Sequence, residues 1–89
     1  MLPVEKVAIF LMMIGMKKGQ SIIELMDNGE IKAVVSRIRS LTAISQEIQQ
    51  SVWAEFKELG YEDNMKPSEA LTIMRFLFNG SKISDKFKR

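Results

Sequence analysis

The chain has 89 residues, 46% of them hydrophobic and 27% charged, a balance that predicts one small globular domain and excludes a disordered tail. It has no cysteine and no histidine, which excludes disulfides, thiolate metal sites and catalysis by a histidine-activated nucleophile. Residues 81–89 carry four basic side chains against one acidic one, whereas residues 1–80 carry nine basic against ten acidic ones. The net charge of +2 therefore comes from the carboxy-terminal segment, and the nearly neutral body disfavours a dedicated nucleic-acid surface.

Eight consecutive apolar residues at positions 7–14 (VAIFLMMI) predict an opening helix over residues 3–14, with Pro3 at its first position and Gly15 just past its end. Successive residues of an α-helix are about 100° apart, so this run covers every side of the helix. The run is too short to span a bilayer, which takes roughly 20 apolar residues. Because a small domain offers little cover, we expect a bound partner to cover part of this helix.

Four more helices are predicted, and no alternating strand pattern or internal repeat interrupts them. A short helix is expected within residues 20–26, an amphipathic helix over 27–41, a fourth over 45–60 and a fifth over 67–80. Asp27 and Glu30 have the spacing of a capping box at the start of the third helix, and Ser45 is the predicted cap of the fourth.

The predicted fold class is all-α, with five short helices in a compact superhelical, armadillo-like array and the start of a sixth, connecting helix at the carboxy terminus. Residues 1–80 form the predicted partner-binding domain. Residues 81–89 place Ile83 and Phe87 at i, i+4 spacing, and we interpret them as the truncated, basic start of the connecting helix.

Catalysis has few candidate residues. Glu55, Glu58 and Glu62 recur at i, i+3, i+7 and are the one row of carboxylates that acid–base chemistry or a metal ion would use. A solvated face explains this row better, because an amphipathic helix keeps one side wet in this way. The glycines stand alone and the serines lack a histidine to activate them, so we predict no enzyme, no cofactor and no metal site.

A helical wheel puts several large apolar residues on the wrong side of their helices. In the opening helix, Glu5 and Lys6 have to reach water and so define the outward side. The core positions opposite them are Val7, Phe10, Leu11 and Ile14. The residues off the apolar side, and hence the candidate partner-binding residues, are Ile9, Met12, Met13, Met16, Trp53 and Phe76. A second internal contact is the alternative for each, because a helix in a small array touches two neighbours.

Five short motifs follow one another along nearly the whole chain. They are Glu5-Lys6 with the apolar run and Gly15, Ile22-Ile23 to Met26, Asp27 with Glu30-Ile31, Ser45 with Ile48 and Ala54-Glu55-Phe56, and Ala70-Leu71 through Phe78 to Gly80, Lys82 and Ile83. In this order they resemble the amino-terminal domain of the FliG family of bacterial flagellar motor switch proteins.

The resemblance implies a non-enzymatic rotor component, cytoplasmic and peripheral to the inner membrane at the flagellar basal body. In that family the amino-terminal domain binds the carboxy-terminal tail of the membrane ring protein FliF as helices packed in an apolar groove, so its membrane association is indirect. Neighbouring copies in a ring are a further expected partner. The switching and torque-generating charges lie in other domains of the family, outside these residues. Met13 stands where relatives often have a smaller or more polar residue, which leaves a divergent paralogue as an alternative.

Two other classes remain as alternatives. A small nucleic-acid-binding domain would use Lys32, Arg37 and Arg39 as a basic recognition face, and its complexes would weaken steeply with salt. A cytosolic regulatory domain of a magnesium transporter would need clustered acidic ligands, and divalent metal would then raise its thermal stability.

Overall fold

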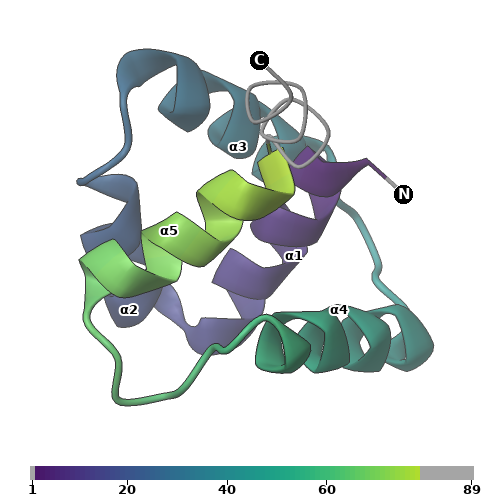
Figure 1. Ribbon diagram of the computed structural model, residues 1–89. Coiled ribbons are helices and arrows are strands. Elements are labelled where there is room, and N and C mark those ends of the chain that lie inside the picture. The colour runs from purple at the N-terminus through teal and green to yellow at the C-terminus, as the bar shows by residue number, and fades with distance from the viewer. Residues whose placement is uncertain (1, 79–89) are drawn as a thin grey trace, which may run out of the picture.

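The computed structural model describes residues 2–78, which form five α-helices and, within that range, no strand (Figure 1). The helices are α1 (Pro3–Ile14), α2 (Met16–Ile23), α3 (Asn28–Ser40), α4 (Gln46–Glu58) and α5 (Pro67–Phe78). The prediction of an all-α fold with five short helices is confirmed. The expected end of the fifth helix at Gly80 and the sixth helix over residues 81–89 lie outside the described residues.

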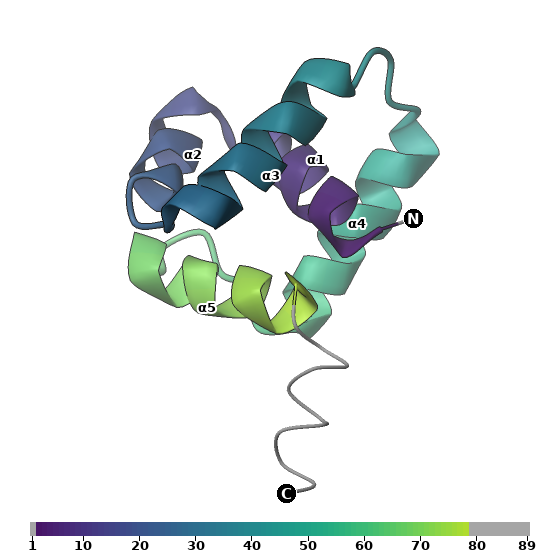
Figure 2. The same cartoon turned by 90° about the horizontal axis from the view of Figure 1, so that it is seen from above.

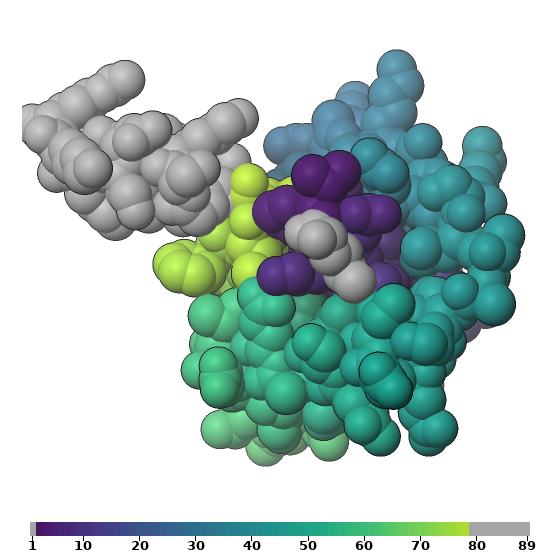
Figure 3. Space-filling model, turned by 90° about the vertical axis from the view of Figure 1, so that its right-hand side faces the viewer, coloured from purple at the N-terminus to yellow at the C-terminus, as the bar shows by residue number. Residues whose placement is uncertain are grey.

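The opening helix α1 is the centre of the fold. It packs against each of the other four helices, and α2 also packs against α5. In Figures 1 and 2, α3 and α4 lie on opposite sides of α1. Figure 3 shows the amino-terminal end of α1, in purple, reaching the surface in the middle of α3, α4 and α5. The chain's own helices therefore supply most of the cover that the apolar run needs.

An aromatic cluster fills the space between α1 and α4. The Phe10 ring is fully buried and stacks on Phe56 with 3.8 Å between ring centroids. Tyr61, from the segment after α4, meets Phe10 edge-on at 4.7 Å. Burial raises the pKa of the Tyr61 hydroxyl, with a smaller contribution from the charge of Asp63. This cluster joins α1, α4 and the connection to α5 in one core.

The predicted helix caps are present. The Asp27 carboxylate accepts a hydrogen bond from the Glu30 backbone N–H at 2.8 Å, and the Glu30 carboxylate accepts one from the Asp27 backbone N–H at 2.9 Å. This reciprocal pair is the capping box of α3. The Ser45 hydroxyl accepts a hydrogen bond from the Ile48 backbone N–H at 3.2 Å and caps α4. Both predictions are confirmed.

The second helix begins earlier than predicted, at Met16 rather than near residue 20. Gly15 has a φ of +98°, a conformation open to glycine, and the chain turns there from α1 directly into α2. Gly19 is buried inside α2 instead of preceding it. A Cβ at this position would lie 3.3 Å from the Leu11 carbonyl oxygen, so the missing side chain is what lets α2 approach α1 closely. Gly19 was taken for a residue that precedes the helix, but it lies within α2 and marks the contact with α1.

Ion pairs join neighbouring helices around α1. The Lys6 ammonium lies 2.9 Å from the Glu55 carboxylate of α4, and the Arg37 guanidinium of α3 lies 3.9 Å from Glu5. Arg75 of α5 donates two hydrogen bonds to Glu30 of α3, at 2.9 and 3.0 Å.

The Arg75 hydrogen bonds hold the pKa of the Glu30 carboxyl below its usual value, and the same contact raises the pKa of Arg75. The α3 capping box and the α3–α5 contact thus share one carboxylate. Both α3 and α5 pack on α1, so this pair ties together two of the helices that enclose the opening helix.

Candidate partner-binding groove

The structure corrects the predicted role of Ile9. Its side chain is only 3% exposed and belongs to the core, so it is not an outward-facing binding residue. The wheel failed because Glu5 and Lys6 do not mark a solvated side: both are partly buried and reach α3 and α4 through the ion pairs described above. Met13 is also partly buried and packs against the core. The expectation that this domain cannot cover its opening helix is therefore wrong for residues 7–11.

Met12 and Met16 lie at the surface, as the wheel predicted. The Met12 side chain is 48% exposed and that of Met16 is 86% exposed. They border a groove of about 480 Å³ between the end of α1, one side of α2 along its whole length and the second half of α3. Its lining is Leu11, Met12, Gly15, Met16, Gly19, Gln20, Ile23 and Ile38. Gln20 supplies the one polar side chain of this lining, so the groove is an apolar surface that crosses three helices.

Leu11, Ile23 and Ile38 are the apolar side chains of the groove that lie outside the predicted partner-binding set. Ile38 has the spacing of the apolar side of α3, and Val34 is the one residue of α3 that is fully buried. The stripe is wider than the surface that α1 covers, and Ile38 remains only partly buried beside the groove. The sequence signal for Ile38 was that the apolar stripe of α3 is broader than a contact with one helix requires.

Trp53 and Phe76 do not belong to this groove. Trp53 is partly buried against Phe10 and Tyr61, with ring centroids 5.7 and 5.8 Å apart, and Lys57 lies over its outer face. This is the internal contact that the sequence left open as an alternative. Phe76 is 49% exposed and borders a separate recess of about 270 Å³ with Leu59, Thr72 and Ile73. The six predicted residues therefore divide among the core, the groove and a recess between α4 and α5.

The predicted carboxylate row does not form a cluster. Glu55 is taken up by its ion pair with Lys6, whereas Glu58 and Glu62 are exposed. Between residues 2 and 78 no group of three potential metal ligands comes together. Over the same range, no helix is long and apolar enough to cross a bilayer.

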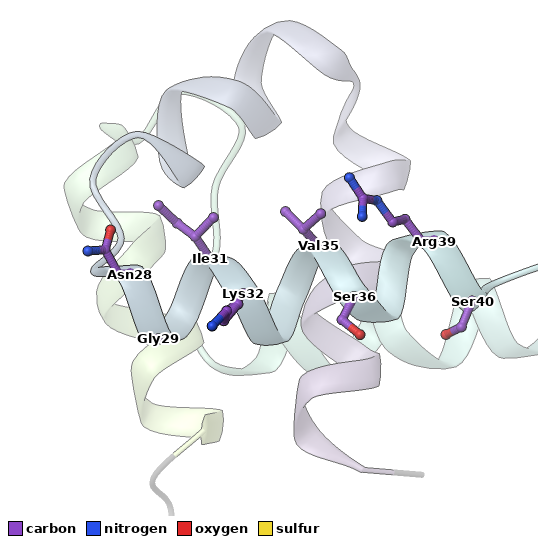
Figure 4. A pocket seen from close by; sticks show the side chains of 8 residues that line it. All are labelled: Asn28, Gly29, Ile31, Lys32, Val35, Ser36, Arg39 and Ser40. Carbon is purple, nitrogen blue, oxygen red and sulfur yellow. The ribbon is translucent and has the colours of Figure 1, made fainter.

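The predicted basic face of α3 is also divided. Arg37 turns towards Glu5 of α1, whereas Lys32 and Arg39 are exposed on the outer side. These two side chains border a wide, shallow hollow of about 910 Å³ along α3 (Figure 4). The hollow and the apolar groove share no lining residue, so α3 contributes to two separate surfaces.

The family model of the FliG N-terminal domain matches residues 1–83 and thus includes all five helices. This family belongs to the rotor and switch of the bacterial flagellar motor and is a structural family rather than a family of enzymes. No curated protein and no solved structure shows a significant match to the chain.

Proposed function

The chain belongs to the FliG N-terminal domain family, and we propose that its apolar groove binds helices from the carboxy-terminal tail of the flagellar membrane ring protein FliF. Such binding would anchor the cytoplasmic rotor to the basal body. The chain would then be cytoplasmic and peripheral to the inner membrane, held there through FliF rather than through lipid.

The observation that carries the proposal is the pair of exposed methionines on the groove. Met12 and Met16 come from different helices, yet both line the same apolar groove, as does Ile38 of α3. Flexible, polarisable methionine side chains adapt to the surface of a partner helix, and an amphipathic helix buries its apolar side in such a groove. Covering the groove would also bury Met12, the one residue of the apolar run that is exposed in the structure.

Binding of a FliF tail peptide, measured by calorimetry and by pull-down with Met12→Asp and Met16→Asp, tests the proposal. Both residues are exposed, so we expect both variants to remain folded. Each should lose binding by roughly 30-fold or more, because a carboxylate in an apolar contact cannot be hydrated after docking. Circular dichroism and thermal melting report whether the fold is retained.

Leu25→Asp is the matched control. Leu25 has the same exposed fraction as Met12, 48%, and does not line the groove. We expect it to bind the peptide as the unmodified chain does. Equal losses in all three variants, or full binding by both methionine variants, would contradict the assignment of the groove.

The salt dependence of the same binding separates this proposal from recognition of a polyanion. An apolar groove should keep its affinity within a few-fold between about 50 and 500 mM salt, whereas phosphate contacts would weaken steeply over that range. Peptide binding by Phe76→Asp is measured as well, because Phe76 lies in the separate recess between α4 and α5. A loss of binding in this variant would extend the proposed interface to α5.

A further inference from the structure

A second cavity lies on the side of α2 opposite to the apolar groove. It has a volume of about 330 Å³ and is formed by α2, the connection between α4 and α5, and the first turn of α5. Figures 1 and 2 show the start of α5 beside α2, and these two helices pack on each other. The polar residues of this cavity, here called the α2–α5 pocket, are Lys17, Lys18, Ser21, Tyr61 and Asp63.

The two cavities use different residues of α2. Positions 16, 19, 20 and 23 line the groove, whereas positions 17, 18, 21 and 22 line the α2–α5 pocket. Because successive residues are about 100° apart, these two sets lie on opposite sides of the helix. No residue lines both cavities, so a ligand in the α2–α5 pocket is compatible with a partner in the groove.

The hydroxyl of Tyr61 has no hydrogen-bond partner in the described part of the chain. Tyr61 is only 4% exposed, and its ring packs against Phe10 and Trp53. Within residues 2–78 no polar side-chain atom that is sealed from solvent lacks a partner, so the Tyr61 oxygen is not sealed. Burial raises the pKa of this hydroxyl, which is therefore protonated at neutral pH. Tyr61 thus brings an unused donor from the core to the lining of the pocket.

The charges of the pocket favour one negative charge on a ligand. Lys17 and Lys18 are exposed at the start of α2, and Asp63 is the one carboxylate of the lining, which leaves a surplus of one positive charge. The Lys18 ammonium donates a hydrogen bond to the Asp63 backbone carbonyl oxygen at 3.1 Å and so lies across the pocket from α2 to the α4–α5 connection. Neither lysine forms an ion pair within residues 2–78.

The remainder of the lining is apolar. Ile22 and Ala70, each 3% exposed, belong to the core as well as to the pocket, and Met65 and Pro67 are more exposed. Sites for small molecules combine such an apolar lining with a few polar groups that fix the orientation of the ligand. Their volumes are roughly 300 to 1,000 Å³, so this pocket is suited to a small ligand.

We propose that the α2–α5 pocket binds a small organic carboxylate with an apolar body. The carboxylate accepts a hydrogen bond from the Tyr61 hydroxyl and lies beside Lys17 and Lys18, and the apolar body packs on Ile22 and Ala70. A single negative charge balances the surplus positive charge, whereas a dianion would be repelled by Asp63. This proposal does not rest on the proposed function, because the groove contributes nothing to the pocket.

Titration with phenylacetate, followed by NMR of the isotope-labelled chain, tests the proposal. For a ligand of about ten non-hydrogen atoms we expect a dissociation constant of about 1 mM, with saturable shifts of the amides that surround the pocket. Phenylacetamide has the same shape without the charge and should bind at least roughly tenfold more weakly. Inorganic phosphate lacks the apolar body and should give no saturable shift.

Tyr61→Phe is the most specific variant, because it removes the hydroxyl and keeps the ring. We expect it to melt at or above the temperature of the unmodified chain, since the hydroxyl has no partner to lose. Phenylacetate should nevertheless bind roughly tenfold more weakly, which is the effect of one hydrogen bond to a charged group. Binding of phenylacetamide should change less, which a purely structural effect of the substitution would not explain.

Lys17→Gln tests the role of charge, because the Lys17 ammonium has no ion pair among the described residues. Phenylacetate should bind roughly threefold to tenfold more weakly to this variant, and Lys17→Arg should restore most of the affinity. Lys32→Gln is the matched control, since Lys32 is an exposed lysine outside the pocket. Its affinity for phenylacetate should equal that of the unmodified chain.

The ring signals of Tyr61 provide a direct measurement, because the chain has one tyrosine. The carbon that bears the hydroxyl should shift on saturation with phenylacetate, and the shift with phenylacetamide should be smaller. Met16→Asp should bind phenylacetate as the unmodified chain does, because Met16 lies outside the pocket. This variant therefore distinguishes a failure of the groove from a failure of the pocket.

Four outcomes would overturn the proposal. The first is the absence of any saturable shift with phenylacetate up to about 10 mM. The second is equal affinity for phenylacetate and phenylacetamide, which would show that the charge is not recognised. The third is unchanged affinity in Tyr61→Phe. The fourth is a set of shifted amides that lies around the apolar groove instead of the α2–α5 pocket.

Discussion

The apolar side chains around the end of α1 have opposite surroundings: residues 7–11 of α1 are here called the first part, and Met12 of α1 with Met16 of α2 the second part. Residues 7–11 are all buried, with exposed fractions of at most 4%. Met12 is 48% exposed, and Met16, just beyond Gly15, is 86% exposed. The first part is enclosed by neighbouring helices. At the second part α1 turns into α2, and Ile38 of α3 is the one residue from another part of the chain that lines the groove there.

This contrast shows that hydrophobicity along a helix does not identify its exposed part. The number of helices packed around each turn decides which residues are covered. The core needs the first part whether or not a partner binds. The second part is available for binding, and the predictions below test this division from the largest expected effect to the smallest.

Ile9→Asp should have the largest effect. A carboxylate at this buried position would lose its hydration without gaining a partner, which costs several kcal/mol and is comparable with the whole stability of a small domain. We expect the cooperative thermal transition to disappear, whereas Met12→Asp should melt almost as the unmodified chain does. A folded Ile9→Asp variant with a normal melting curve would show that the first part of the run is not enclosed.

Phe10→Ala should destabilise the domain by about 3 to 5 kcal/mol, because it removes a fully buried ring from the stack with Phe56 and Tyr61. Urea unfolding followed by circular dichroism measures the change. Met13→Ala is the comparison on the same helix, and the partly buried Met13 should lose less stability. A loss below about 1 kcal/mol for Phe10→Ala would contradict the central role of the aromatic cluster.

Glu30→Gln tests the enclosure of the first part, since the Glu30–Arg75 pair ties α3 to α5. Glutamine keeps the cap of α3 and removes the charge, so we expect a loss of roughly 0.5 to 1 kcal/mol at neutral pH. The pKa of Glu30 is lowered in the folded chain, so the contribution of the pair is fully present above its ordinary value of 4.5. It is lost as the pH falls through the lower, folded value.

The difference between the unmodified chain and Glu30→Gln should therefore shrink on acidification, and unfolding curves at pH 7 and at low pH measure it. Glu58→Gln is the control, because Glu58 is exposed and has no ion pair among the described residues. A constant difference between the two chains at every pH would show that the ion pair adds nothing.

Met16→Ala should have the smallest effect on stability, within about 0.5 kcal/mol, because its side chain is almost fully exposed. Binding of the FliF tail peptide should nevertheless weaken by roughly tenfold or more if the groove is its site. Unfolding and calorimetry on one sample give both quantities. A clear loss of stability without a change in binding would contradict the proposed division between the first part and the second part.

Much of the fold could be predicted from local sequence signals. The apolar run with Pro3, the capping box of Asp27 and Glu30, and the Ser45 cap each act within a few residues, so the sequence reports them directly. The start of α2 was missed because Gly19 serves a contact with Leu11, which lies on the preceding helix. A single close approach at a glycine adds no apolar residue to the periodic pattern of either helix.

The candidate groove was predicted only in part. Met12 and Met16 were found because they fall off the expected core side, whereas Ile9 was misplaced because charged residues were assumed to face water. Glu5 and Lys6 instead reach ion-pair partners on α3 and α4, which a helical wheel cannot show. Ile38 was missed because it follows the periodicity of the core and yet lies beside a gap in the packing.

The order of residues by itself determined the all-α class, the helix caps and the presence of an opening helix too apolar to face water. Those properties depend on backbone geometry and on neighbours within about one helical turn. Only the tertiary structure decided which part of that helix is enclosed and that α2 and α3 leave a groove beside Met12 and Met16. Burial depends on how many other helices surround a side chain, and that number is set by contacts between residues far apart in the chain.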